Sequence, residues 1–421
     1  MTLFGQLGTL ESAGLLQVAR VDPELEYLFR HALLQDAAYA SLLEIDRRRL
    51  HKIVGETVEN LYPERLDEFS AVLSLHFAQA GDDLQALRYA GRAGDNALAT
   101  YANREAEIHY RRALQLACPE SERVPLLAGL GEALYRLGRL EEALEIWRDA
   151  IAIYRDLDDL NGVAFLYARS SRVAWHDGDH PEGLRLSKEG LEAISGAPDS
   201  SQVAMLIHEA ARACYFNGYQ EKALHLCKKA LEMAERLEAT EVLADALATY
   251  GVLPDVPDED GVKALQKSIE LAERKGYLGI ALRAYHNLGA HMSGQVDGKD
   301  TAMEYFLRSA ELGHQRGVAS ESHYSLTSAV GIALDSGRLQ EAADIVAQMF
   351  QLADKMPEPG VARLNTQVVQ ASLLWMQGDW DQALQLSRIC QQAARQRGDL
   401  QQLMVVNKSL PKGNLFHTAD L

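Results

Sequence analysis

The sequence predicts an all-α protein, a right-handed solenoid of stacked helical hairpins, from a short phrase that recurs along its 421 residues. Each clear copy has a turn Gly, four further residues and then a small residue. The small residues of clear and degenerate copies are Ala143, Gly183, Ala223, Ala264, Ala302, Ala342 and Ala383, spaced by 40, 40, 41, 38, 40 and 41. A near-constant period of this length, with apolar residues at helical spacing in each copy, is typical of stacked helix pairs.

The copy over residues 126–150 shows how the helices of one unit are expected to pair. Its two halves carry apolar residues at helical spacing, and Gly138 supplies the turn between them. Gly131, Ala143 and Ala150 are small where two helix backbones are expected to cross closely. One hairpin of this kind cannot bury its apolar face, so neighbouring copies must stack into a continuous core.

This copy resembles the tetratricopeptide repeat. The matching residues, in the order of the motif, are Leu130, Gly131, Leu134, Gly138, Ala143, Trp147 and Ala150. The period exceeds the length of about 34 residues usual for that repeat, so we expect longer helices. We expect the first helical hairpins over residues 63–117, tetratricopeptide-like repeats over 118–400 and a C-terminal tail over 401–421.

Residues 1–62 differ in kind from the repeats. Two short apolar stretches, 15–20 and 25–30, flank the sequence Val-Asp-Pro-Glu and predict a β-hairpin. Helices are expected over about 32–43 and 46–61, the second broken before a proline. A helix that ends at Gly14, a two-stranded wing and further helices resemble the back end of a winged-helix domain. We therefore expect a partial winged-helix or junction segment here.

Three phrases around this junction resemble one family. They cover residues 29–39, 47–51 and 76–86 and read FRHALLQDAAY, RRRLH and HFAQAGDDLQA. They resemble the segment that joins ATPase to repeats in signal-transduction ATPases with numerous domains. The closest likeness is to bacterial adenylate/guanylate cyclase-type and AAA-type members with tetratricopeptide tails. The resemblance implies an ATPase or cyclase module N-terminal to the junction, in cis or in trans.

The sequence itself carries no such module. It contains no phosphate-binding loop of the form GxxxxGK[ST]; the nearest approach, 294–300, has too few residues between its glycines. The resemblance would place His31 at the phosphate of bound ADP, but only if an ATPase domain were present. We expect His31 here to be a partly exposed structural side chain. We therefore expect no enzymatic activity, no cofactor and no metal.

Charge and cysteine content narrow the class of partner. The formal net charge of −18 argues against nucleic acid and against anionic membranes. No apolar run reaches the roughly 20 residues needed to span a bilayer. The 4 cysteines lie far apart without C-x-x-C pairs, which favours buried reduced thiols. These features predict a cytoplasmic protein that binds a protein, a peptide or a small acidic effector.

Aromatic residues and arginines recur in the first half of several copies. The candidate groove residues are Tyr135, Arg136, Arg172, Trp175, His176, His208, Arg212, Tyr215, Phe216 and Trp375. In one interpretation they line a concave groove, where rings and guanidinium groups recognise a peptide or an acidic ligand. In the other, the rings pack between repeats and the arginines pair with Glu132 or other carboxylates. Aromatic periodicity favours packing.

Two classes of function remain. The favoured one is a noncatalytic interaction and sensor scaffold, the repeat portion of a signal-transduction ATPase, which binds a protein segment or a small effector in its concave groove. The alternative is a regulatory fragment of an adenylate/guanylate cyclase or of a winged-helix transcriptional activator. Its DNA contacts would have to rest on one short basic cluster, Arg47–Lys52.

Overall fold

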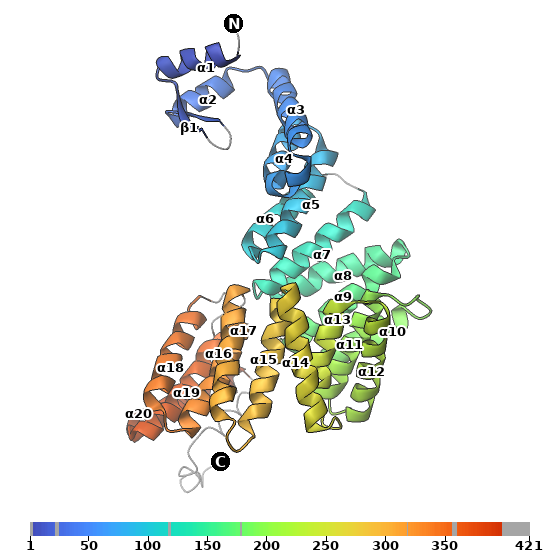
Figure 1. Ribbon diagram of the computed structural model, residues 1–421, viewed down its shortest axis with the longest axis vertical. Coiled ribbons are helices and arrows are strands. Elements are labelled where there is room, and N and C mark those ends of the chain that lie inside the picture. Colours follow the sequence, from blue (N-terminus) through green and yellow to red (C-terminus); the bar gives the residue numbers. More distant parts are fainter. Residues whose placement is uncertain are drawn as a thin grey trace. The chain divides into compact units, whose positions relative to one another are not determined.

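The computed structural model describes residues 3–21, 25–116, 119–176, 179–317, 319–355 and 360–397. Nearly all regular structure in these ranges is α-helix (Figure 1). This confirms the all-α, helical-hairpin prediction. Across the described ranges, no helix is both long and apolar enough to cross a membrane. The tail expected over residues 401–421 lies outside the described residues.

The N-terminal unit comprises residues 3–96 and 109–116. Its elements are α1 (Leu3–Ser12), β1 (Leu16–Arg20), β2 (Glu26–Phe29), α2 (Ala32–Ala40), α3 (Glu44–Leu61), η1 (Pro63–Arg65), α4 (Leu66–Ala80), most of α5 (Asp83–Ala99) and the second half of α6 (Asn103–Leu114). The expected hairpin is present, with Leu16 paired to Phe29 in antiparallel register. Helix α3 begins two residues earlier than expected, because Leu43 adopts an extended conformation and starts it.

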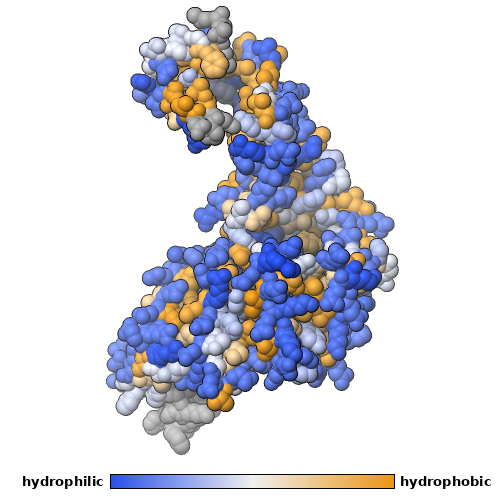
Figure 2. All heavy atoms as spheres, in the orientation of Figure 1, coloured by the Kyte–Doolittle hydropathy of each residue, from blue (hydrophilic) through white to orange (hydrophobic). Residues whose placement is uncertain are grey.

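The first three helices of this unit leave many apolar side chains in solvent. Leu16 is the one buried apolar residue among the described positions 3–61. Phe4, Leu33, Leu43 and Ile45 are all exposed. Orange, apolar atoms accordingly show on the surface of this part of the chain in Figure 2. The stretch therefore has almost no hydrophobic core of its own.

The second unit comprises residues 97–108 and the described residues from 119 to 397, and it contains seven helical hairpins within them. The helices that come first in each hairpin, called the first helices below, are α7 (Glu120–Arg136), α9 (Leu160–His176), α11 (Ser201–Phe216), α13 (Thr240–Tyr250), α15 (Leu278–Ser293), α17 (Ala319–Asp335) and α19 (Gly360–Gln377). Their partners are α8 (Leu140–Asp156), α10 (His180–Ala193), α12 (Gln220–Arg236), α14 (Asp258–Lys275), α16 (Lys299–Gln315), α18 (Leu339–Ala353) and α20 (Trp380–Arg397). From α9 onward each first helix also packs on the next first helix, which builds the solenoid.

The turn within a hairpin depends on glycine, as the repeated phrase predicts. Gly138 ends the turn of α7 with φ of +79°, and Gly218 ends α11 with φ of +80°. A side chain is strained in this left-handed conformation, whereas glycine adopts it freely. The backbone amide of Arg139 then bonds the carbonyl of Leu134 at 3.0 Å, which closes the helix end.

Small residues let paired helices approach closely. A β-carbon added at Gly131 of α7 would lie 2.2 Å from Nε1 of Trp147 on α8. That indole is fully buried, and its Nε1 donates to the carbonyl oxygen of Ala128 at 3.0 Å. The glycine and the tryptophan therefore act as one packing unit.

The cysteines in the described ranges agree with the expected reduced state. Cys214, Cys227 and Cys390 are buried and unpaired, and burial raises the pKa of Cys227 to about 12. A buried thiol with a raised pKa holds little thiolate and is chemically inert.

Candidate functional site

The second unit curves until its beginning meets two later inter-helix turns. The hydroxyl of Tyr101, just before α6, donates to the carbonyl of Gly276 at 3.4 Å. The Nδ2 atom of Asn103 donates to the carbonyl of Arg316 at 3.5 Å. Residues more than 170 positions apart in sequence therefore touch, so the row of first helices curves back on itself. We call the inner side of this curve the channel.

Two polar side chains of the first helices are exposed and have raised pKa values. Tyr324 on α17 is 62% exposed, and desolvation raises the pKa of its phenol. Glu241 on α13 is also exposed, and its pKa is raised by desolvation first and by Asp245 second.

A chain of ion pairs runs along the inner side of four consecutive first helices. Arg172 on α9 binds both Glu209 on α11 and Asp245 on α13. Arg283 on α15 binds Asp245 from the other side, and Arg212 donates to Glu209 at 2.8 Å. We call these five residues the ion-pair ladder. Because each carboxylate is shared between two guanidinium groups, the ladder links four repeats.

The protonation of the ladder follows from its charges. Burial alone would raise the pKa of Glu209, but Arg172 and Arg212 hold it at about 2. Burial likewise opposes ionisation of Asp245, yet Arg172 and Arg283 keep its pKa well below the usual range. Burial lowers the pKa of Arg212 to about 10, so it too stays charged at neutral pH. The ladder is therefore ionised throughout.

His208 lies inside the ladder and remains neutral. Its Nδ1 is 3.7 Å from Glu209 and 3.6 Å from Asp245, and its Nε2 is 2.8 Å from the hydroxyl of Thr249. Burial lowers the pKa of His208 to about 4 against the pull of both carboxylates. Ligand atoms of His208, Glu209 and Asp245 come close enough together to suggest a metal site. Their carboxylates are already bound by guanidinium groups, however, so the chemistry of this set is that of an ion-pair cluster.

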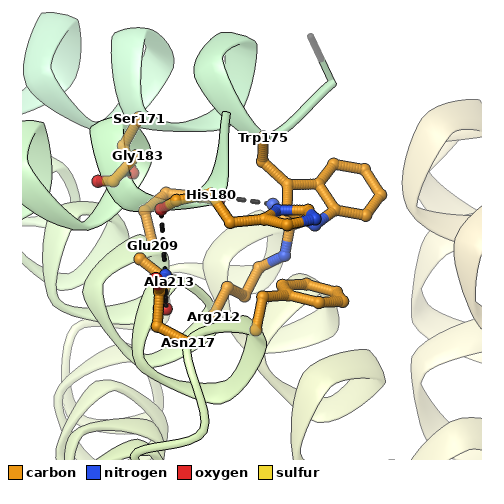
Figure 3. A pocket seen from close by; sticks show the side chains of 9 residues that line it. Ser171, Trp175, His180, Gly183, Glu209, Arg212, Ala213 and Asn217 are labelled. Carbon is orange, nitrogen blue, oxygen red and sulfur yellow. Dashed lines mark hydrogen bonds and ion pairs between the residues drawn. The ribbon is translucent and has the colours of Figure 1, made fainter. Parts of the chain in front are cut away.

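The structure brings four of the candidate groove residues into one aromatic cluster. The rings of Trp175 and Phe216 lie 5.0 Å apart, and those of Tyr215 and Phe216 also 5.0 Å apart. The guanidinium of Arg212 lies 4.9 Å from the centre of the Trp175 ring. Figure 3 shows Arg212, Trp175 and the neighbouring His180 grouped at one small pocket. The pocket has room for about one water molecule, so the cluster supports the packing interpretation of these residues.

The other candidates lie in different places. Tyr135 is buried, and the guanidinium of Arg169 lies 5.1 Å from the centre of its ring. Arg136 donates to Glu132 at 2.7 Å, as the packing interpretation expected. Trp375 on α19 has its ring 6.2 Å from that of Trp380 and does not join the aromatic cluster. The side chain of His176 lies outside the described residues.

The sequence predicts that His31 is a phosphate sensor only beside an ATPase domain, and otherwise a partly exposed structural side chain. It is exposed and directly precedes α2, where its side chain makes no capping hydrogen bond. Its role remains a prediction.

A second group of charges lies where the beginning of the second unit meets the α16–α17 turn. Arg136 and Arg169 both bind Glu132 on α7, while Arg316 at the end of α16 binds Glu321 on α17. Burial alone would raise the pKa of Glu132, but Arg169, Arg136 and the more distant Arg316 hold it at about 2. We call these five residues, with Tyr135, the closure cluster. Its members come from α7, α9 and the α16–α17 turn.

Sequence reasoning found one partner in most of these pairs and missed the other. The carboxylate lies 37 positions away from its arginine in the pairs Glu132–Arg169 and Arg172–Glu209. This offset is about one helical turn less than the repeat period, so each pair joins positions that differ by one turn in their repeats. Opposite charges at that offset were the available signal. The link between α7 and Arg316 left no local signal, because it depends on the curvature of the whole unit.

Comparisons with known proteins identify the fold class. No family model matches the chain, and no curated protein matches it in sequence. A similar solved structure is that of a Signal Transduction ATPase with Numerous Domains (STAND) protein with a tetratricopeptide repeat sensor from Pyrococcus horikoshii. It has 13% identity and a TM-score of 0.53, over 97% of this chain and 60% of that one. A second is a Rap protein complexed with Competence and Sporulation Factor, at 11% identity and a TM-score of 0.53, over 76% of this chain and 95% of that one.

At these identities the likeness concerns the fold alone. The chain is a tetratricopeptide-like helical solenoid, as the repeated phrase predicted. It spans 60% of the length of the STAND protein that it matches. The likeness to cyclase-type regulators stays a prediction, as do the domain boundaries expected from the sequence.

Proposed function

We propose that this protein is a noncatalytic sensor scaffold that binds a peptide, or an extended segment of a protein, in the channel of its second unit. The observation that carries the proposal is the curvature of the second unit, whose first helices carry ion pairs and the exposed side chains of Tyr324 and Glu241. The Rap protein of similar fold was solved in complex with a factor, and the STAND protein carries its repeats as a sensor. Both support an interaction role for such a fold.

The chemistry of the channel suits an extended peptide. The charges of the ladder are bound to one another, whereas Tyr324 and Glu241 are exposed and available for contacts. A phenol ring offers a flat apolar surface together with a hydroxyl, and a carboxylate accepts backbone or side-chain N–H groups. A chain of peptide units, with alternating donors and acceptors, complements such a lining.

The test is affinity selection of a random hexapeptide library with free C-termini on the full chain, read by mass spectrometry. We expect a subset of peptides to be enriched, and Tyr324→Ala to reduce that enrichment by about tenfold, the value of one lost aromatic contact of about 1.4 kcal/mol. Ile389→Ala, an exposed apolar position on the partner helix α20, is the matched control and should leave binding unchanged. A library that shows no enrichment, or enrichment that ignores Tyr324, contradicts the proposal.

A second candidate function rests on the exposed apolar residues of α1–α3. We propose that this surface docks against a nucleotide-switch module of the ATPase or cyclase kind, in cis or in trans. Exposed apolar area that lacks a core is characteristic of an interaction surface. The coding sequence upstream of Met1 and the adjacent reading frames should then encode a module with a phosphate-binding loop. That module should co-purify with the chain, and Leu33→Glu should abolish co-purification. Unchanged co-purification of Leu33→Glu contradicts the docking surface.

A further inference from the structure

We propose that Tyr39, His51 and His76 form a proton-controlled latch, which ties the elements α1, β1, β2 and α2 to α3 and α4 and opens when both imidazoles are protonated. We call these three residues the latch and the four elements the wing segment. The latch lies in the N-terminal unit and is independent of peptide binding in the channel. Each of the three phrases singled out around the junction contributes one of its residues.

The three side chains come from three helices and form a continuous chain of contacts. The hydroxyl of Tyr39 on α2 lies 2.9 Å from Nε2 of His51 on α3. The Nδ1 of His51 lies 2.9 Å from the Nδ1 of His76 on α4. The two imidazole rings are 5.0 Å apart, and the phenol ring meets His51 edge-on at 5.8 Å. His51 therefore uses both ring nitrogens, one towards each neighbouring helix.

Packing holds α2 only weakly, which gives the latch its importance. No residue of α2 is buried. The guanidinium group of Arg47 on α3 lies 5.3 Å from the centre of the Tyr39 ring, so the same tyrosine makes a second contact with α3. The attachment of the wing segment to α3 therefore depends on the position of Tyr39 and on its bond to His51.

The pairing of α3 with α4, in contrast, is fixed by close packing. A β-carbon added at Gly55 of α3 would lie 2.9 Å from the buried ring of Phe77 on α4. Since these helices are packed in direct contact, repulsion between His51 and His76 must be relieved by rotation of an imidazole. The contact of His51 with Tyr39 is exposed and that with His76 is partly buried, so His51 has space to turn outward. Such a rotation breaks its bond to Tyr39.

The hydrogen bonds of the histidine pair admit one extra proton but not two. When both imidazoles are neutral, one Nδ1–H donates to the other Nδ1. When one imidazole is charged, it still donates to the neutral one. When both are charged, both Nδ1 atoms carry hydrogen, so the bond is lost and two positive charges face each other at contact distance. The two histidines therefore titrate as a coupled pair.

The surroundings of the pair keep it neutral at pH 7. Burial lowers the pKa of His51. Burial first, and the charge of His51 second, lower the pKa of His76. The carboxylate of α2, Asp36, is exposed. The carboxylates of α3 and α4 have other partners: Glu44 binds Arg48, Asp46 binds Arg49, Glu56 binds Lys52, Glu59 binds Tyr89, Asp67 binds Arg92 and Glu68 binds Arg65. Because the pKa values lie below that of an unfolded histidine, the latch is closed above about pH 6.5 and opens as the pH falls.

The experiment is hydrogen–deuterium exchange of the full chain between about pH 7.5 and 5, read by mass spectrometry and corrected for the intrinsic exchange rate. We expect the protection of α2 in the native chain to fall by about fivefold at the acid end, as the loss of one net hydrogen bond implies. Tyr39→Phe, which lacks the hydroxyl, should show the low protection at both ends of the range. His76→Gln, which cannot take up a proton, should keep the high protection at both ends.

Two comparisons isolate the latch. Tyr27→Phe removes a phenol hydroxyl of β2, outside the latch, and should behave as the native chain does. His76→Gln keeps every other histidine, so its difference from the native chain at low pH reports the pair alone. Exchange in α12 at neutral pH reports whether each variant folds, and His76→Asn replaces His76→Gln if that variant does not.

The opposite behaviour of the two latch variants decides the outcome. Constant protection of α2 in the native chain across the pH range overturns the latch. So does protection in Tyr39→Phe that equals the native value at neutral pH, or protection in His76→Gln that is lost at low pH as in the native chain. Low protection of Tyr39→Phe at neutral pH, together with retained protection of His76→Gln at low pH, supports the latch.

Discussion

Gly131 shows how strongly one missing β-carbon constrains this protein. The position looks ordinary in the sequence, a glycine within a helical pattern, and helical glycine normally costs stability relative to alanine. Here the indole of Trp147 occupies the space that a side chain would need. The close crossing of α7 and α8 was predictable from the small residues. The orientation of the Trp147 indole was not, because it depends on the side-chain rotamer that the surrounding packing allows.

We expect Gly131→Ala to destabilise the protein by about 1–3 kcal/mol, because the added β-carbon overpacks a filled core. The matched control is Gly331→Ala on α17, where an added β-carbon meets nothing within 4 Å. That change should instead stabilise by about 0.5–1 kcal/mol through helix propensity. Urea unfolding of both variants provides the comparison, and equal effects would refute the packing described for Trp147.

Asp245 is central to the stability of the ion-pair ladder, because it binds both Arg172 and Arg283. Asp245→Asn removes the carboxylate that Arg172 and Arg283 share, which leaves Arg283 without its charged partner and Arg172 with Glu209 alone. We expect a loss of about 3–5 kcal/mol, the usual cost of breaking a buried ion pair. Glu259→Gln, which breaks an exposed pair with Lys263, should cost less than about 1 kcal/mol. If Asp245→Asn and Glu259→Gln have the same denaturation midpoint, the ladder adds no stability.

At the scale of elements, a recurring hydrogen bond joins the first helices of successive hairpins, in addition to apolar packing. A histidine on one first helix meets a hydroxyl on the next in three places: His208 with Thr249, His286 with Ser325 and His323 with Thr366. The distances are 2.8, 3.2 and 2.7 Å. Burial lowers the pKa of each of these histidines to about 4. The three bonds therefore belong to the neutral imidazoles.

This pattern predicts a specific dependence of stability on pH. The pKa of histidine is about 6.5 in the unfolded chain and is depressed in the folded one. The contribution of the three histidines is thus complete above about pH 6.5 and is lost as the pH falls towards 4. The expected slope is about 1.4 kcal/mol per pH unit for each histidine. Urea unfolding between pH 7 and 5 measures it.

The variant His208→Asn/His286→Asn/His323→Asn should flatten this slope. His225→Asn, an exposed position on α12, is the control and should leave the slope unchanged. A slope that persists in the triple variant would assign the acid sensitivity to other groups.

The elements themselves were largely predictable from the sequence, for physical reasons. The turn glycine and helical apolar spacing that predict the α7–α8 hairpin are local signals, as are the two apolar stretches that predict the β-hairpin. Both hairpins are present where these signals indicated. The candidate site was less predictable. Periodicity identified Arg172 and Arg212, but their acceptors depend on the stagger of successive helices and on the curvature of the unit.

The curve of the second unit is closed by a hydrogen bond that is longer, and therefore weaker, than those within its helices. Asn103 reaches Arg316 at 3.5 Å, near the limit of a hydrogen bond. We expect Asn103→Ala to increase amide hydrogen exchange both around residues 97–108 and around residues 312–317, although these segments are distant in sequence. Exchange in α12, which takes no part in the contact, should stay constant. Faster exchange in α12 as well would indicate general destabilisation instead of opening.

A negative prediction concerns nucleotide chemistry. The chain contains no phosphate-binding loop, so we expect no ATP binding and no ATPase or cyclase activity from it alone. Isothermal titration calorimetry with ATP and Mg²⁺ tests this directly. Micromolar binding that survives His31→Ala would reveal a nucleotide site elsewhere in the chain.

The span of Arg172 across two repeats limits how this protein can change length. Solenoid arrays in which each repeat touches only its neighbours can gain or lose single units during gene duplication and recombination. Here an arginine of α9 holds a carboxylate two hairpins further on, so deleting the hairpin α11–α12 would remove Glu209 and shift Asp245 by a whole unit. The guanidinium group of Arg172 would then lie beside residues of another repeat instead of Glu209 and Asp245. The stretch from α9 to α15 must therefore be inherited, shuffled or grafted as one indivisible block.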